Sequence, residues 1–252
     1  MSYMETRHSL NVTGNGTSSG GVFKDIKIVG DAQFQGSVDC MSFRCTGTAR
    51  VSGDLKSTSF GLSGNLDMDG DLDTGKATVN GRLEVGGNVK AQEIKSNGET
   101  TIRGHVAGEQ IQMEGTFHIK GRCEAETLGI KGMFRIGGLV TADLVHIGMH
   151  SRCTAHEIGG ERIEVRRAEG TMLKKLIGSF FLPADFYEGT LDAETIEGDD
   201  VYVEYTNAKV VRGKHVTLGP GCRIQQVEYT HEFHNEAGST VAEAIKTGHG
   251  LE

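Results

Sequence analysis

The sequence predicts an all-β fold, a single-stranded parallel β-helix in which each coil holds 17 residues. Three observations support this prediction: glycine is abundant, the glycines recur at one fixed interval, and apolar residues follow the same interval. Glycine supplies 37 of the 252 residues, whereas proline supplies only 2. This composition excludes collagen and proline-rich disorder, and a fixed short period is typical of solenoid proteins.

Glycines mark the corners of the predicted coils. Two series recur every 17 residues and are offset from each other by six. A bend favours glycine because it needs backbone angles or close approaches that a Cβ atom obstructs. The members are Gly30, Gly47, Gly64, Gly81, Gly98, Gly115 and Gly132 in one series, and Gly36, Gly53, Gly70, Gly87, Gly104, Gly121 and Gly138 in the other.

Apolar residues form columns with the same interval. Within one coil they alternate with polar residues, as at Leu83 and Val85, which is the period of a strand. One coil cannot bury its own apolar face, so the coils are expected to stack in parallel at β spacing. The columns are Phe34, Val51, Met68, Val85, Ile102, Ile119, Ile136 and Cys153; Phe43, Phe60, Ala77, Ile94, Ile111, Leu128 and Val145; and Val38, Leu55, Leu72, Val89, Val106, Cys123 and Val140.

The predicted organisation has five parts along the chain. They are a flexible N-terminal tail (1–20), the β-helix (21–167), a connector (168–190), further β-helical coils (191–230) and a C-terminal tail (231–252), with a short helix as the alternative for the last dozen residues.

The interval between equivalent residues is expected to change once along the chain and then to return to 17. It lengthens to 18 between Val145 and Ile163. The further coils are predicted to resume an interval of 17, on the evidence of three pairs: Val201 with Leu218, Tyr205 with Cys222, and Val210 with Val227.

Charge and cysteine usage limit the partners and the compartment. A formal net charge of −8 disfavours nucleic acid as a partner. Five cysteines without CxxC spacing, and a polar N-terminus, predict a cytoplasmic location, with peripheral attachment to the inner face of the membrane as the alternative. Cys45, Cys123 and Cys153 fall in the apolar columns and are expected in the core. No spacing typical of metal ligands occurs, so we expect neither a metal nor a cofactor.

Two short motifs imitate known ligand sites. The segment 70–77 nearly matches a phosphate-binding loop, but Ala77 replaces the hydroxyl residue that would hold magnesium and lies in an inward column. Aspartates at 67, 69, 71 and 73 lack the glycine and glutamate of a calcium-binding loop. We expect them to form a solvated acidic face, because alternate residues of a strand point the same way.

The segment 215–224 supports an alternative function. It resembles the hexapeptide repeat of left-handed β-helix acyltransferases over about two steps of that repeat. In this alternative the chain is an enzyme with a site near His215 and Cys222, and His215 acts as the general base. A corner in the further β-helical coils explains the same residues without catalysis.

An apolar segment in the connector is the candidate contact site. It carries two lysines beside large apolar side chains, a combination that suits a membrane surface or another subunit. The alternative is a connector that folds over an open end of the solenoid. The candidate residues are Leu173, Leu176, Ile177, Phe180, Phe181 and Leu182.

The repeat over residues 22–166 resembles the bactofilins, which are bacterial polymer-forming cytoskeletal proteins. The pattern is clear at Val79-Asn80-Gly81-Arg82-Leu83-Glu84-Val85-Gly86-Gly87-Asn88-Val89. The resemblance implies a right-handed β-helix with a triangular core. It also implies a non-enzymatic scaffold that polymerises end to end without nucleotide and serves cell shape, motility or the placement of cell-wall enzymes. The implied partners are further copies of the chain, related bactofilins, or cell-wall and motility proteins. Residues 168–252 go beyond the compact β-helix that is common in this family.

Overall fold

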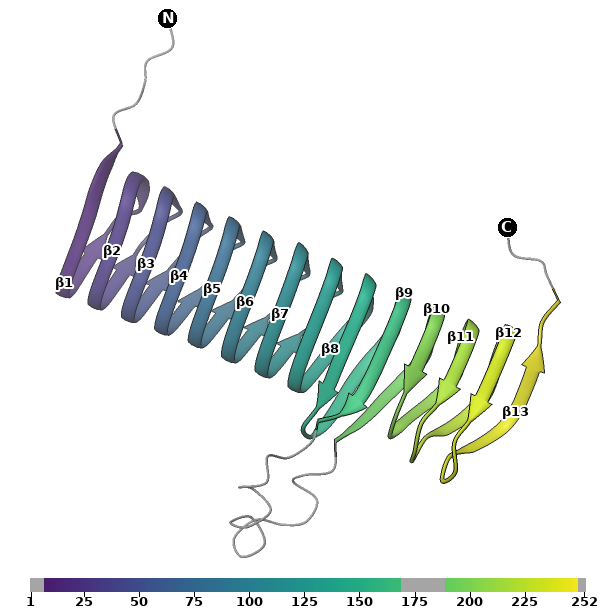
Figure 1. Ribbon diagram of the computed structural model, residues 1–252. Helices are drawn as coiled ribbons and strands as arrows, with labels where there is room; N and C mark the ends of the chain where they lie inside the picture. The colour runs from purple at the N-terminus through teal and green to yellow at the C-terminus, as the bar shows by residue number, and fades with distance from the viewer. Residues whose placement is uncertain (1–6, 169–188, 249–252) are drawn as a thin grey trace, which may run out of the picture. The chain divides into compact units, whose positions relative to one another are not determined.

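The computed structural model describes residues 7–168 and 189–248, which form strands and no helix (Figure 1). The strands pair in chain order from β1 to β13, and neighbouring strands run parallel. The predicted β-solenoid is therefore confirmed. No helix in the described part of the chain could span a membrane.

The strands differ little in length within the regular repeat, and β8 continues through more than one coil. Their bounds are β1 (His8–Ser18), β2 (Gly21–Phe34), β3 (Val38–Val51), β4 (Leu55–Met68), β5 (Leu72–Val85), β6 (Val89–Ile102), β7 (Val106–Ile119), β8 (Cys123–Met149), β9 (Arg152–Arg167), β10 (Thr190–Val203), β11 (Thr206–Leu218), β12 (Arg223–Asn235) and β13 (Thr240–Lys246).

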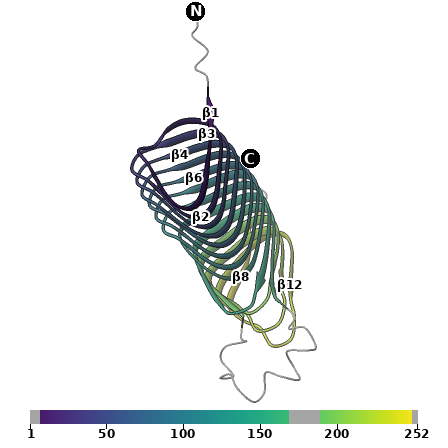
Figure 2. The same ribbon diagram turned by 90° about the vertical axis from the view of Figure 1, so that its left-hand side faces the viewer.

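The chain divides into two compact units, residues 1–113 with 118–121 and residues 114–117 with 122–252. In the first unit the glycine series stacks as the sequence predicts, because Gly30 pairs with Gly47 and Gly47 pairs with Gly64. Figure 2 views this unit from its N-terminal side, where successive coils lie one behind another. The 17-residue interval is thus the length of one coil.

Each of the strands β3 to β6 buries three pairs of side chains. In β3 these pairs are Val38 with Cys40, Phe43 with Cys45, and Ala49 with Val51. Like residues meet across coils: the rings of Phe43 and Phe60 stack with centroids 5.5 Å apart. The predicted apolar columns therefore form the core.

Glycine is required at the corner of the Gly30 series. At Gly64 the φ angle is +133°, and a Cβ atom there would lie 2.1 Å from the carbonyl oxygen of Gly47. Any other residue at position 64 would be strained by the positive φ angle, and its Cβ atom would clash with the carbonyl oxygen of Gly47. Gly61 is different, because the nearest atom to its added Cβ, Cγ of Arg44, lies 3.8 Å away.

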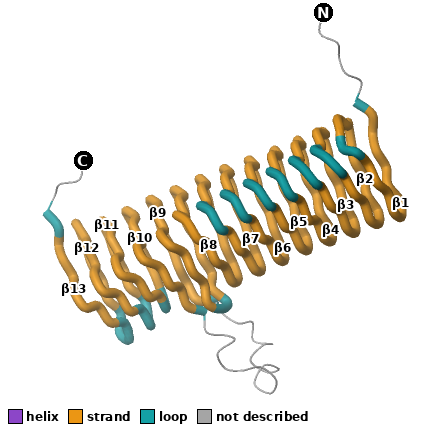
Figure 3. The backbone as a smooth tube through the Cα atoms, turned by 180° about the vertical axis from the view of Figure 1, so that it is seen from behind, coloured by secondary structure: helices purple, strands orange, loops and turns teal. Residues whose placement is uncertain are grey.

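The second corner is held by side chains that bond to the next coil. The loops at this corner recur along the first unit (Figure 3). The backbone N–H of Asp71 donates to Oδ1 of Asp54 at 2.8 Å, and that of Asn88 donates to Oδ1 of Asp71 at 2.6 Å. His105 continues the series by donating its N–H to Oδ1 of Asn88 at 2.9 Å. Asp71 thus has a structural role within the acidic run, because it satisfies a loop donor that has no strand partner.

The second unit departs from the predicted interval. Val145 pairs with Ile163, as expected, but Val201 pairs with Val216 and Val203 pairs with Leu218, an interval of 15. The predicted pairs Val201 with Leu218, Tyr205 with Cys222 and Val210 with Val227 are therefore wrong. The corners are shorter here: two residues, Glu204 and Tyr205, connect β10 to β11, and Tyr205 takes the left-handed conformation at φ 46°. The interval of 17 returns only further on, where Val216 pairs with Phe233 and Ile224 with Val241.

Charge matching accompanies the 15-residue interval. The acidic strand β10 faces the basic strand β11, and residues 15 apart form contacts of 2.7–2.9 Å. Each exposed pair stabilises the fold only weakly, but a shift of register would place several like charges together. The pairs are Lys209 with Glu194, Arg212 with Glu197, Lys214 with Asp199, and His215 with Asp200.

The predicted tails are partly wrong. Residues 8–18 form β1, where Leu10 and Val12 pair with Ile26 and Ile28 and continue their columns. The polar composition of residues 1–20 concealed these two inward residues. At the other terminus β12 extends to Asn235 and β13 follows as a strand, since Val241 pairs with Ile224. Neither a tail nor a short helix begins at residue 231.

The connector lies between paired strands. Cys153 of β9 pairs with Leu191 of β10, so the chain leaves and rejoins the same stack. Residues 169–188 lie outside the described part of the chain, and the predicted limits of the connector stay a prediction.

Substituting Gly64 with Ala should destabilise the first unit strongly. Backbone strain at a position of this kind costs about 1–3 kcal/mol, and the contact with Gly47 adds to it. Gly61→Ala is the matched control and should change the free energy of unfolding by less than about 0.5 kcal/mol. Equal destabilisation of the two variants in urea denaturation would contradict the assigned corner.

Candidate functional site

Two strands at the ends of the sheet order have one paired edge each. β1 pairs with β2 and β13 pairs with β12, and neither strand pairs on its other side within the described residues. The side chains of Leu10 and Val12 are half-buried, whereas Ile26 and Ile28, which pair with them, are buried. An uncovered strand edge with inward apolar residues can add a further strand.

The edge at β13 is uneven. β13 pairs with residues 223–229 of β12 and leaves residues 230–235 of that strand without a following coil. Phe233 in this uncovered stretch is half-buried, and its ring lies 5.6 Å from that of Tyr229. The second unit therefore has backbone N–H and C=O groups without a strand partner, and an aromatic side chain, at its edge.

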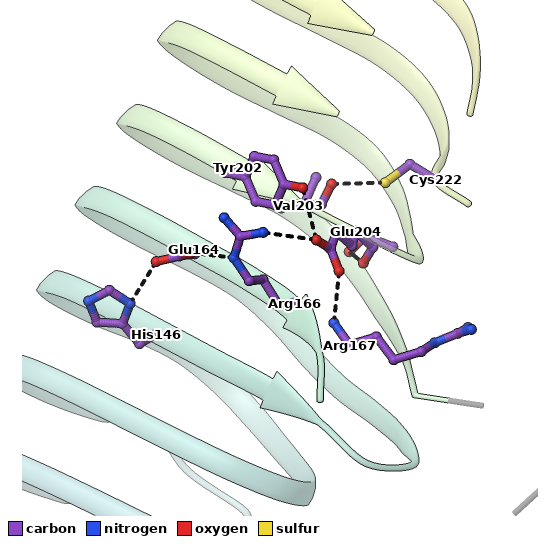
Figure 4. A network of polar contacts seen from close by, with 9 residues as sticks. His146, Glu164, Arg166, Arg167, Tyr202, Val203, Glu204 and Cys222 are labelled. Atoms are coloured by element: carbon purple, nitrogen blue, oxygen red, sulfur yellow. Dashed lines mark hydrogen bonds and ion pairs between the residues drawn. The ribbon is translucent and has the colours of Figure 1, made fainter. Parts of the chain in front are cut away.

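A polar cluster surrounds the two points where residues 169–188 join the solenoid (Figure 4). We call it the Glu204 cluster; it consists of Glu164, Arg166, Arg167, Tyr202 and Glu204. Glu204 accepts hydrogen bonds from Nη1 of Arg166 at 3.1 Å, from the backbone N–H of Arg167 at 3.1 Å and from the Tyr202 hydroxyl at 2.8 Å. Its side chain is only 14% exposed, so these bonds are partly shielded from water.

Further contacts fix the arginines of the Glu204 cluster. Nε of Arg167 donates to the carbonyl oxygen of Gly189 at 3.1 Å, which ties the residues before and after the undescribed segment together. The guanidinium groups of Arg166 and Arg167 lie over the rings of Tyr202 and Tyr205, at 4.2 and 3.2 Å from the centroids. Cation–π contacts of this kind add to the hydrogen bonds.

The same contacts shift the pKa values of the cluster. Burial, and then the hydrogen bond to Glu204, raises the pKa of Tyr202 to about 12. The hydrogen bond from Arg166 lowers the pKa of Glu164 below its ordinary value. The Glu204 cluster is therefore a structural ionic network at neutral pH, with Glu164 charged and Tyr202 protonated.

The predicted contact residues lie outside the described part of the chain. They are Leu173, Leu176, Ile177, Phe180, Phe181 and Leu182, and their role stays a prediction. The Glu204 cluster was missed in the sequence, because Arg166 and Glu204 are 38 residues apart and belong to no repeat. The adjacent arginines at 166 and 167 were the one available signal.

The two residues of the acyltransferase alternative occupy different environments. Nδ1 of His215 lies 2.8 Å from Oδ1 of Asp200 on the surface. Cys222 is 1% exposed, donates its thiol proton to the carbonyl of Val203, and has a pKa raised by burial. A buried, protonated thiol is a poor nucleophile, so Cys222 is a core residue in this arrangement, and the role of His215 as a general base stays a prediction.

The remaining cysteines and motifs follow the repeat. All five cysteines are free and buried, and burial raises the pKa of Cys123 to about 12, as expected for core residues. Ala77 is 1% exposed within β5, and no helix follows the segment that imitates a phosphate-binding loop. Within residues 7–168 and 189–248, no group of three potential ligands could hold a metal ion.

The fold and its open edges define a β-solenoid repeat protein with two strand edges available for addition. Residues 22–124 match the family model "Bactofilin: Polymer-forming cytoskeletal". The chain therefore carries a bactofilin domain over these residues, and the resemblance seen in the sequence is confirmed there. Most of the second unit lies beyond the match.

Two curated relatives from Bacillus subtilis (strain 168) are similar to part of the chain. The uncharacterized protein YhbF is 36% identical over 109 residues, which cover 43% of this chain and 41% of the relative. The uncharacterized protein YhbE is 33% identical over 111 residues, which cover 43% of each protein. The match thus spans less than half the length of either relative. No solved structure matches the chain.

The pH dependence of stability should reveal the Glu164–Arg166 pair. The pKa of Glu164 is lowered on folding, so the pair stabilises the folded state above the ordinary carboxyl pKa of about 4.3 and loses this effect as pH falls through the lower folded value. The melting temperature of Glu164→Gln should therefore be lower than that of wild type at pH 7, and the two melting temperatures should converge below about pH 4. A constant difference across this range would contradict the ionic role.

Proposed function

We propose that the chain is a cytoskeletal scaffold protein that polymerises with itself and needs no nucleotide. The observation that carries this proposal is the bactofilin domain at residues 22–124, whose family is described as polymer-forming and cytoskeletal. The open edges of β1 and β13 support it, because each can continue the parallel ladder with a strand from another copy. Shape maintenance, motility and placement of cell-wall enzymes are the cellular roles that this proposal includes.

A cytoplasmic location belongs to the same proposal. Five free, buried thiols are compatible with a reducing compartment. We further propose that the apolar segment 173–182 contacts either the inner face of the membrane or a second subunit. Co-sedimentation of Phe180→Ser/Phe181→Ser and wild type with lipid vesicles, and separately with preformed polymer, distinguishes these two partners.

A charge placed at the open edge should block polymerisation. Val12 is half-buried at the edge of β1, so Val12→Lys sets an ammonium group where the next coil would stack. Negative-stain electron microscopy without nucleotide or metal should show filaments or sheets for wild type and small particles for Val12→Lys.

The matched control is Val29→Lys. Val29 is 45% exposed on the outer surface of β2, so the same substitution leaves the edge unchanged and polymers should persist. Small particles for wild type, or equal polymer from Val12→Lys when its melting temperature is unchanged, would refute assembly through this edge.

A further inference from the structure

A long groove crosses the second unit and lies outside the residues matched to the bactofilin family. It runs over β8 to β12, has a volume of about 1260 Å³, and is lined within this unit alone. Five strands at about 4.8 Å spacing span about 19 Å, which is the length of about six extended residues. The groove therefore suits an elongated ligand that lies across the coils.

The floor of the groove is made by glycines at one point of successive coils. Gly160 pairs with Gly198, and Gly198 pairs with Gly213. A Cβ atom on Gly198 would lie 2.7 Å from the carbonyl oxygen of Gly160, and one on Gly213 would lie 2.6 Å from that of Gly198. The coils approach too closely here for side chains, so the floor of the groove consists of glycine backbone, and charged side chains line the groove beside it.

The walls carry an excess of negative charge. Five acidic residues line the groove, Glu157, Glu161, Glu197, Asp199 and Glu228, so they outnumber the two bases Arg212 and Lys214 by three.

Part of this charge is already compensated. Arg212 contacts Glu197 at 2.8 Å and Glu228 at 2.6 Å, while Lys214 contacts Asp199 at 2.7 Å. Within the described residues, Oε1 of Glu157 lies 3.7 Å from Nε2 of His156, and the charge of Glu161 acts on Lys214 without a close ion pair. The carboxylates with the weakest cationic contacts in the groove thus flank Gly159 and Gly160 at its β9 end.

We propose that this groove binds an extended, lysine- or arginine-bearing peptide segment of a partner protein. The glycine floor gives the peptide backbone room, and basic side chains reach Glu157 and Glu161 on either side. Electrostatic complementarity of this kind selects basic over acidic segments and weakens with salt. The site rests on the proposed scaffold function and extends it, because a partner would bind across the coils of the second unit; the groove ends at Thr230 and His231, beside the uncovered stretch of β12.

The test blocks the groove without disturbing the fold. Gly159 has a backbone that other residues adopt, and its added Cβ would meet only the carbonyl oxygen of Glu197, at 4.0 Å. Gly159→Trp should therefore fold and fill the groove, whereas Gly61→Trp is a matched control on the first unit. The probe is a fluorescently labelled hexapeptide of alternating lysine and threonine, and its binding to the full chain is measured by fluorescence anisotropy.

Wild type and Gly61→Trp should bind the probe equally, and Gly159→Trp should weaken binding at least about tenfold. Glu157→Gln/Glu161→Gln should have the same effect, whereas Glu99→Gln/Glu109→Gln removes as much charge from exposed positions of the first unit and should have little effect. A probe that fails to bind wild type, or that responds equally to both double variants, overturns the proposal.

Electron microscopy of Gly159→Trp separates partner binding from self-assembly. If Gly159→Trp forms normal polymers but no longer binds the peptide, the groove is a partner site. This result does not depend on the proposed role of the polymer. Loss of polymers in a variant that keeps its melting temperature would show that the groove is an interface between copies of this chain, and would overturn the proposal.

Discussion

Each inner coil of this protein depends on hydrogen bonds to the coil before it and to the coil after it. A parallel stack satisfies the backbone only when equivalent residues meet, as when Gly47 pairs with both Gly30 and Gly64. This constraint explains why glycine recurs where a Cβ would strike the preceding carbonyl, and why Asp54, Asp71 and Asn88 each accept an N–H from the next coil. The same dependence leaves the outermost strands incomplete and open to further addition.

The sequence predicted the first unit well because its coils have one length. A constant interval places Phe43 beneath Phe60 without any knowledge of three-dimensional structure. The interval in the second unit could not be predicted, because its corners change length. At one of these corners Tyr205, rather than a glycine, takes the left-handed conformation. Leu10 and Val12 were overlooked in a polar stretch, since two apolar residues give too weak a pattern to indicate a strand.

The Glu204 cluster shows a second limit of prediction from sequence. Its members come from the ends of β9 and from β10, and a segment outside the repeat separates them in the chain. Only after Cys153 is paired with Leu191 do Arg166 and Glu204 become neighbours. Ionic contacts across an insertion do not recur at a fixed interval in the sequence, whereas contacts between regular coils do.

The two units divide the chemistry of the protein between them. The first carries most of the match to a polymer-forming family. The second lies mostly beyond that match and has charge-matched strands, the Glu204 cluster and a groove with an acidic end. In the proposals made above, the strand edges serve assembly and the groove serves a partner.

X-ray fibre diffraction from aligned polymers tests the central claim, that assembly continues the stack of coils. A strong reflection along the filament axis at about 4.8 Å is expected, because the coils stack at strand spacing in that direction. A reflection at this spacing across the axis would mean that the copies associate through their sides, and would contradict the account.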